Sequence, residues 1–181
     1  MKQLLVNADD FGFSVGINQG IEQTVRNGIV TSASVLANGA AVRDALNRAG
    51  SLHLPIGLHA NLTLGTPICD PQSIPSLVDS NGCFFGKSAF IQRLFLGQIH
   101  LKDAERELNA QLIALSGVQI DHINSHHHIH ALPPLASIFS RLAGGANVWL
   151  RRPQHLVKHG PCLTARLHGW SIGTGFALCR Y

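Results

Sequence analysis

Short apolar segments and longer amphipathic segments alternate along the chain. A brief apolar or β-branched run is typical of a buried strand, and apolar residues at helical spacing are typical of a surface helix. This pattern predicts strands at Gln3–Asn7, Thr31–Ala37, Pro55–Leu58, Gln119–Asn124 and Asn147–Leu150. It predicts helices at Val15–Arg26, Ala40–Ala49, Ser88–Phe95, Leu101–Leu115 and Pro134–Leu142. Strands that alternate with helices indicate an α/β fold with a parallel sheet.

Signals between these elements mark turns, a loop and a boundary. Ser14 stands at the N-cap position of the first helix, and Asn27-Gly28 ends that helix. Residues 63–86 are rich in Pro, Gly, Asp, Asn and Ser, which predicts a long loop. The periodic pattern is lost after Arg152. We therefore expect one domain over residues 1–153 and a basic tail without assigned structure over residues 154–181.

Composition narrows the class of protein. The 181 residues are 45% hydrophobic and 13% charged, which excludes a disordered chain. No uncharged apolar run reaches the roughly 18–20 residues that span a bilayer. The first apolar stretch is also too short for a signal peptide, because Asp9 and Asp10 end it. These features predict a cytoplasmic protein without a membrane span.

The charges are divided unevenly along the chain. Residues 1–121 hold eight Lys/Arg and ten Asp/Glu, whereas residues 122–181 hold six Lys/Arg and no acid. A basic segment attracts phosphate groups and nucleic acid. These six basic residues are scattered and have few aromatic residues among them, so the pattern does not favour a nucleic-acid partner.

Side chains that bind metals stand at the ends of three predicted strands. Asp9 and Asp10 follow the first strand, His59 follows the third, and His126 begins a histidine-rich run after the fourth. Taken singly, adjacent acids often cap a helix, and a lone histidine is often a hydrogen-bonded core residue. Functional groups of parallel α/β folds gather at the carboxyl ends of strands. Together these residues predict a divalent-metal site of one Asp and two His.

The second acid and the remaining histidines extend this prediction. One carboxylate can bind the ion while its neighbour takes a proton from water, because a divalent ion lowers the pKa of bound water toward ~7. That division of roles suits hydrolysis of an amide or an ester. Residues 122–130 hold five of the eleven histidines. In an extended segment, side chains two residues apart project to one side, so we expect a shared face for His122, Asn124, His126, His128 and His130.

Three segments, in the same order as in a known family, carry a resemblance. Val6-Asn7-Ala8-Asp9-Asp10-Phe11-Gly12, Gly57-Leu58-His59 with Asn61-Leu62-Thr63, and Asn124-Ser125-His126-His127-His128-Ile129-His130 resemble the YdjC-like carbohydrate deacetylases. That family includes chito-oligosaccharide deacetylases and hopanoid-biosynthesis-associated proteins. The resemblance covers about residues 3–153. It implies a distorted (β/α) barrel of the polysaccharide-deacetylase type, incomplete at the C-terminus.

The resemblance also implies an activity and a site. It implies metal-dependent removal of N-acetyl groups from a small carbohydrate, an amino-sugar or a chito-oligosaccharide. By matching position, it makes Asp10, His59 and His126 the ligands of one Mg²⁺ or Zn²⁺ ion, and Asp9 the general base. The residues that it places around the substrate are His128, His130, Arg151 and Arg152.

The chain departs from the family pattern in two places. Many relatives carry Asp where this chain has Asn124, a difference that bears on subfamily. Relatives also carry a later His-Pro motif that supplies a general acid, and no segment after Pro153 matches that motif. A barrel without its last strands would expose sheet edges, so a homo-oligomer is an expected assembly.

Three other functions stay open at the level of sequence. A catalytically silent remnant of the same family would bind metal or sugar and release no acetate. The His-x-His-x-His spacing of His126, His128 and His130 also occurs in amidohydrolase barrels, where it usually follows an early strand. A histidine-rich metal carrier would need a flexible low-complexity tract, whereas this cluster lies between a predicted strand and Pro133-Pro134.

Overall fold

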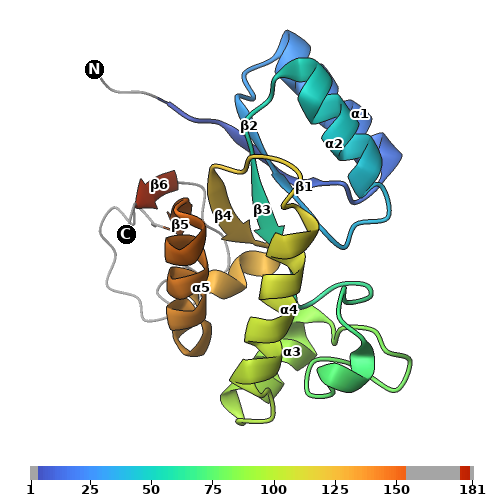
Figure 1. Cartoon of the computed structure of the whole chain (residues 1–181), viewed down its shortest axis with the longest axis vertical. Coiled ribbons are helices and arrows are strands. Elements are labelled where there is room, and N and C mark those ends of the chain that lie inside the picture. The colour runs from blue at the N-terminus through green and yellow to red at the C-terminus, as the bar shows by residue number, and fades with distance from the viewer. Residues whose placement is uncertain (1–3, 154–175, 180–181) are drawn as a thin grey trace, which may run out of the picture.

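A computed structural model describes residues 4–153 and 176–179, and it shows an α/β fold built on one sheet (Figure 1). Five strands run parallel and lie side by side in chain order, and a sixth pairs antiparallel with the fifth. The strands are β1 (Asn7–Phe11), β2 (Ser32–Val35), β3 (Ile56–Ala60), β4 (His122–Ser125), β5 (Trp149–Pro153) and β6 (Phe176–Cys179). The predicted α/β fold with a parallel sheet is confirmed. Among the described strands, β1 and β6 are the two edges of the sheet.

Helices connect the parallel strands and cover the sheet (Figure 1). In the described part of the chain they are α1 (Val15–Asn27), α2 (Val42–Leu52), α3 (Lys87–Phe95), α4 (Leu101–Ala114) and α5 (Pro133–Ala146). Helices α1, α4 and α5 contact β1, β3 and β5 respectively, and α1 packs beside α2. Ser14 caps α1 by accepting a hydrogen bond from the Ile17 N–H, as predicted. Two short 3₁₀ helices complete the set, η1 (Pro71–Ser73) and η2 (His126–Ala131).

Four of the five parallel strands lie further along the chain than the hydrophobic pattern indicates, whereas β2 lies inside its predicted range. The predicted strand at Gln3–Asn7 is wrong, because β1 runs over Asn7–Phe11 and contains Asp9 and Asp10. Strand β3 likewise contains His59. Strand β5 contains Arg151 and Arg152. A sequence pattern assigns these polar residues to loops, yet all five lie in strands. Asp9, His59 and Arg151 have hydrogen-bond partners on other strands.

Apolar side chains from strands and helices meet in one core. Leu58 and Ile123 from the sheet and Leu108 and Phe139 from the helices are fully buried. Burial of such side chains contributes about 1.5–3 kcal/mol each before entropy is subtracted. The core therefore fixes the strands whose carboxyl ends carry the polar residues.

Glycine allows the loops after β1 and β2 to meet. Gly12 has a φ of 98°, in the left-handed region that disfavours other residues. A Cβ atom on Gly39 would lie 2.3 Å from the carbonyl oxygen of Gly12. This close approach holds the carboxyl end of β1, where Asp10 lies, against the loop that follows β2.

No helix in residues 4–153 combines the length and apolar character needed to cross a membrane. Most of the predicted tail, residues 154–175 and 180–181, lies outside the described residues. The exception is β6, which pairs with β5 over Leu150–Pro153.

Candidate metal centre and catalytic site

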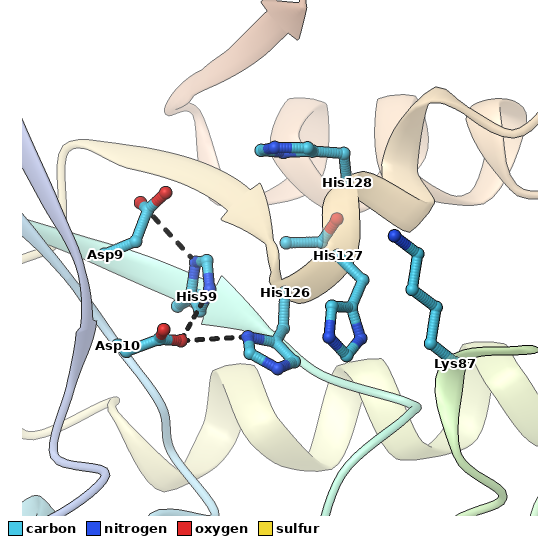
Figure 2. Close-up of a pocket in the computed structure, with 8 residues that line it drawn as sticks. Asp9, Asp10, His59, Lys87, His126, His127 and His128 are labelled. Carbon is cyan, nitrogen blue, oxygen red and sulfur yellow. Dashed lines mark hydrogen bonds and ion pairs between the residues drawn. The ribbon is translucent and has the colours of Figure 1, made fainter. Parts of the chain in front are cut away.

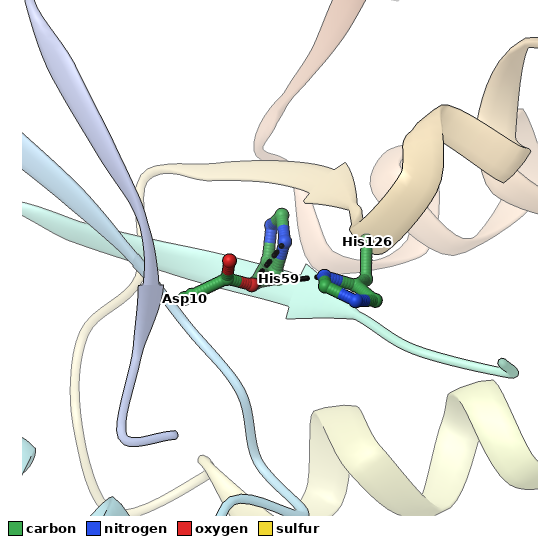
Figure 3. A group of neighbouring side chains, drawn as sticks. All are labelled: Asp10, His59 and His126. Atoms are coloured by element: carbon green, nitrogen blue, oxygen red, sulfur yellow. Dashed lines mark hydrogen bonds and ion pairs between the residues drawn. The ribbon is translucent and has the colours of Figure 1, made fainter. Parts of the chain in front are cut away.

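The carboxyl ends of β1, β3 and β4 bring one acid and two histidines together (Figure 3). Asp10 Oδ1 lies 2.9 Å from His126 Nδ1 and 3.2 Å from His59 Nε2. One candidate ligand atom from each residue lies within 4.8 Å of the other two. Two imidazole nitrogens and one carboxylate oxygen form a donor set that binds divalent ions and leaves positions for water and substrate.

An irregularity in β1 lets two adjacent acids face the same histidine. In a regular strand, neighbouring side chains point to opposite faces. The register between β1 and β2 shifts between Ala8 and Phe11, and Asp10 has a left-handed φ of 63°. A non-glycine residue in that conformation costs on the order of 1–3 kcal/mol. As a result Asp9 and Asp10 both contact His59, at 3.7 Å and 3.2 Å.

Asp9 is surrounded by hydrogen-bond donors. Its Oδ1 accepts from Asn7 Nδ2 at 2.9 Å and from Asn124 Nδ2 at 2.7 Å. Its Oδ2 accepts from Arg151 Nη1 at 3.2 Å. Burial alone would raise the pKa of Asp9, but the charges of His59 and Arg151 and these hydrogen bonds outweigh burial and lower that pKa. Asp9 is therefore held as a carboxylate.

Asp10 is held as a carboxylate for a related reason. Its hydrogen bonds to His126 and His59 lower its pKa far below the usual range and outweigh the opposing effect of burial. Both acids of the site are therefore anionic at neutral pH. A carboxylate binds a metal ion in its deprotonated form, which is the form that Asp10 has.

Asn124 links Asp9 to His59 and determines which nitrogen of the imidazole is free. The carboxylate of Asp9 can only accept, so the Asn124 group that faces it is the NH₂. The Oδ1 of Asn124 then faces His59 Nδ1 at 2.6 Å, and Nδ1 must donate. Because Nδ1 is engaged by Asn124, Nε2, which lies 3.2 Å from Asp10 Oδ1, is the His59 nitrogen that could bind a metal ion, in the arrangement that supports metal-binding histidines in general.

A cavity of about 220 Å³ opens over these residues (Figure 2). Its lining consists of Asp9, Asp10, His59, Lys87, Ser125, His126, His127 and His128. Lys87, the first residue of α3, was not expected from the sequence. A single lysine at a helix start resembles an ordinary surface charge, and only the tertiary structure brings it to the cavity.

The histidine run after β4 does not continue as an extended segment. Strand β4 ends at Ser125, and η2 follows with left-handed backbones at His127 and His128, each with a φ of 56°. The Ser125 hydroxyl closes this turn by accepting from the His130 N–H at 3.0 Å. The predicted shared face of His126, His128 and His130 is therefore wrong. His126, His127 and His128 line the cavity, whereas His130 is buried outside its lining.

Comparison with known proteins decides the family. The family model described as YdjC-like protein matches residues 3–177. This chain belongs to the YdjC-like family. The resemblance identified from the three sequence segments is thereby confirmed.

Curated and solved relatives agree with this assignment. A carbohydrate deacetylase from Brevibacillus brevis is 40% identical over 159 residues, which cover 83% of this chain and 59% of that protein. A chitooligosaccharide deacetylase from Yersinia pseudotuberculosis is 37% identical over 88% of this chain and 63% of its own length. A crystal structure from Enterococcus faecalis, assigned to cellobiose-phosphate cleavage, superposes with a TM-score of 0.79 at 34% identity, over 87% of this chain and 61% of that one. The YdjC-like chain spans about three fifths of the length of these relatives.

In this YdjC-like chain, burial keeps three histidines of η2 neutral, His127, His128 and His130. Burial, with the charges of His126 and Lys87, lowers the pKa of His127 to about 4. Burial lowers the pKa of His130 to about 3, and burial and Arg151 lower that of His128. His127 Nδ1 lies 2.9 Å from Thr63 Oγ1, whereas the buried Nδ1 of His128 has no hydrogen-bond partner among the described residues. The neutral imidazoles that line the cavity, His127 and His128, can donate or accept hydrogen bonds with a polar ligand.

The four residues expected around the substrate occupy different places in the YdjC-like fold. His128 lines the cavity, and Arg151 is buried beside Asp9. His130 hydrogen-bonds Ser125 Oγ at 2.6 Å, and its ring lies 5.9 Å from that of Phe139. Arg152 is exposed on the opposite face of β5 from Arg151, because strand side chains alternate.

Proposed function

We propose that this chain is a metal-dependent hydrolase that removes N-acetyl groups from an amino-sugar or a chito-oligosaccharide. The observation that carries the proposal is the convergence of Asp10, His59 and His126 beside a second carboxylate, Asp9. The curated relatives named carbohydrate deacetylase and chitooligosaccharide deacetylase support the substrate class.

The donor set fits one divalent ion, Mg²⁺ or Zn²⁺. Imidazole nitrogens are ligands that Zn²⁺ binds readily, and a carboxylate with open positions for water also suits Mg²⁺. Asp10, His59 and His126 would hold the ion, and Asn124 supports His59 through its Nδ1. When bound, the ion would supply Lewis acidity, which polarises a carbonyl group and acidifies water.

Asp9 would accept the proton of the attacking water. Its Oδ1 already accepts two hydrogen bonds, from Asn7 and Asn124, whereas Oδ2 accepts one, from Arg151. Oδ2 is therefore the oxygen with free capacity for a proton. The lowered pKa keeps Asp9 deprotonated before the reaction. His128, which lines the cavity, would contact the sugar or its acetyl group.

The proposal includes the architecture that the resemblance implies. Parallel strands that follow one another in chain order, each with a helix outside, form the wall of a (β/α) barrel. The order β1 to β5 supports a distorted barrel of this kind. A cytoplasmic location and a homo-oligomer stay predictions.

Acetate release from N-acetylated chito-oligosaccharides tests the proposal. The purified chain should release acetate with added Mg²⁺ or Zn²⁺. The release should stop when a chelator removes the ion. Asp9→Asn should lower kcat by about 10²–10⁴-fold while metal affinity is kept, because general-base catalysis contributes that much. Asp70→Asn is the matched control, since Asp70 caps η1 and does not line the cavity.

Two outcomes would overturn parts of the proposal. Full activity of Asp9→Asn would remove Asp9 from the role of general base. Metal uptake by the folded chain without any acetate release would indicate a silent metal- or sugar-binding protein of the same family.

A further inference from the structure

A chain of hydrogen-bonded side chains crosses the sheet from the start of β4 to β1 and ends on Asp9. Asp121 Oδ1 is hydrogen-bonded to His122 Nδ1. His122 Nε2 lies 2.8 Å from Ser34 Oγ on β2. Asn7 Nδ2 lies 2.8 Å from Ser34 Oγ and 2.9 Å from Asp9 Oδ1. None of the four side chains before Asp9 lines the cavity.

The carboxylates at both ends determine the direction of every hydrogen bond. Asp121 and Asp9 can only accept. His122 therefore donates from Nδ1, and in the neutral ring Nε2 accepts the proton of the Ser34 hydroxyl. The two protons of Asn7 Nδ2 go to Ser34 Oγ and to Asp9 Oδ1. In the reversed orientation, the Asn7 amide oxygen would face the Asp9 carboxylate and repel it.

Asp121, His122 and Ser34 have the connectivity of a nucleophilic triad but not the access that one needs. In a catalytic triad the serine oxygen faces the substrate. Ser34 is 0% exposed, and its hydroxyl is occupied by His122 and Asn7. The serine therefore cannot attack a substrate, and the end of the chain that reaches the cavity is Asp9.

The backbone at Gly57 leaves the space for the His122 ring in the middle of the hydrogen-bonded series of side chains. A Cβ atom on Gly57 would lie 2.5 Å from atoms of the His122 ring and 2.4 Å from the His122 carbonyl oxygen. Glycine at position 57 on β3 is thus what allows the ring to lie between β2 and β4. His122 is 5% exposed, so protein encloses its ring on nearly all sides.

We propose that Asn7, Ser34 and His122 are positioning residues for Asp9. Asn124 and Arg151 hold the Asp9 carboxylate from β4 and β5, and Asn7 holds it from its own strand. Asn7 can do so only while Ser34 and His122 fix the second proton of its amide. Small displacements of a catalytic group lower rates sharply, which is the physical basis of the proposal. The inference rests on the proposed role of Asp9 as general base.

Two serines on β2 give a matched pair of variants. Ser34→Ala removes the central link, whereas Ser32→Ala removes an equally buried hydroxyl that donates only to the Pro55 carbonyl. We expect Ser34→Ala to lower kcat about tenfold, with KM and metal affinity unchanged, because the carboxylate loses orientation and not charge. Ser32→Ala should leave kcat unchanged. An equal fall of kcat in both variants would show a structural effect alone and overturn the proposal.

Substitution of His122 tests the same link by rescue. The side-chain carbonyl of Gln can accept the Ser34 proton, whereas Phe fills the space beside Gly57 without an acceptor. His122→Gln should therefore keep more of the wild-type kcat than His122→Phe. Equal loss in the two variants would contradict the proposed role of His122.

Nuclear magnetic resonance gives a readout that does not need catalysis. In ¹H–¹⁵N spectra, Ser34→Ala should shift the Asn7 side-chain proton that faces Ser34, and Ser32→Ala should leave the Asn7 amide unchanged. If the wild-type chain releases no acetate, the proposed function fails while this spectrum still tests the hydrogen-bonded chain. Unchanged Asn7 side-chain resonances in Ser34→Ala would overturn the positioning proposal.

Discussion

The two sides of the cavity are built in different ways (Figure 2). On the strand side, Asp9, Asp10 and His59 each contact residues on other strands. On the loop side, His127 and His128 lie on a left-handed turn and have few polar partners. Groups held by a sheet stay in place through a reaction, whereas groups with unsatisfied polar atoms can bind a ligand. The strand side thus suits chemistry, and the loop side suits substrate contact.

The two sides of the cavity also differ in the charge of their buried side chains. Burial disfavours the charged form of acids and bases alike. On the strand side, cationic and hydrogen-bonding partners overcome burial and keep the pKa values of Asp9 and Asp10 low. On the loop side, burial prevails and lowers the pKa of His127 to about 4. The cavity therefore has an anionic wall that attracts a cation, and the histidines of its other wall are neutral beside the cationic Lys87.

The largest effect is expected from removal of the shared carboxylate on the strand side. Asp10→Ala should weaken Zn²⁺ binding on the order of 1,000-fold, because loss of a ligand exceeds the 10–100-fold loss seen for supporting residues. Asp70→Ala is the control, since Asp70 lies outside the cavity lining. Isothermal titration calorimetry measures both. Wild-type affinity in Asp10→Ala would mean that Zn²⁺ binds elsewhere.

A change at Gly57 should disturb the strand side through packing. Gly57→Ala should lower the free energy of unfolding by about 3 kcal/mol, because the new methyl overlaps the His122 ring and carbonyl. Gly20→Ala, in α1 with open space around it, should raise stability by up to ~1 kcal/mol. Urea denaturation compares the two. Equal stability of the two variants would show that β3 and β4 tolerate a side chain between them.

The buried histidine next to the loop side should make stability depend on pH. The pKa of His130 is lowered to about 3, so between its ordinary value and 3 the unfolded chain binds a proton that the folded chain does not. Stability is therefore complete above about pH 6.5 and falls as the pH decreases, by up to ~1.4 kcal/mol per pH unit for one group.

Replacement of His130 measures its contribution to the pH dependence of the unfolding free energy. His130→Gln should make the fall in unfolding free energy between about pH 6.5 and pH 4 shallower, because Gln does not titrate. His100→Gln, at a side chain that is 71% exposed, should leave the slope unchanged. Identical slopes in wild type and His130→Gln would remove His130 as the cause.

The smallest effect is expected on the loop side. His127→Ala removes one hydrogen bond, to Thr63, and no proposed metal ligand. Because the variant also loses an imidazole that lines the cavity, we expect KM for the oligosaccharide to rise about threefold to tenfold, as for loss of one neutral hydrogen bond of ~0.5–1.5 kcal/mol, with metal affinity unchanged. His100→Ala is the control in the same assay. A loss of Zn²⁺ binding in His127→Ala would erase the distinction between the two sides.

Local signals in the sequence predict much of the fold. Ser14 marks the start of α1, and hydrophobic periodicity predicts all five helices that the structure describes over residues 4–153. The strand limits could not be predicted, because Asp9, His59 and Arg151 are polar residues inside strands. Their side chains are stabilised by partners from distant segments, and a local pattern contains no information about those partners.

The sequence likewise predicts only some of the residues of the candidate site. Asp10, His59 and His126 could be selected because three separated segments each end a strand with a metal-binding side chain. The extended geometry expected for His128 and His130 was wrong, because the backbone enters η2 directly after Ser125. The Ser125 hydroxyl accepts a hydrogen bond from the His130 N–H in that turn. Lys87 and the hydrogen-bonded chain through Ser34 depend on contacts across the fold, which spacing along the sequence does not reveal.

The most direct test of the account is X-ray diffraction at the zinc absorption edge from crystals of this chain saturated with Zn²⁺. The account predicts one anomalous peak within coordination distance of Asp10, His59 and His126, about 2.0–2.2 Å from their ligand atoms. A peak at other histidines, or none at these three residues, would contradict it.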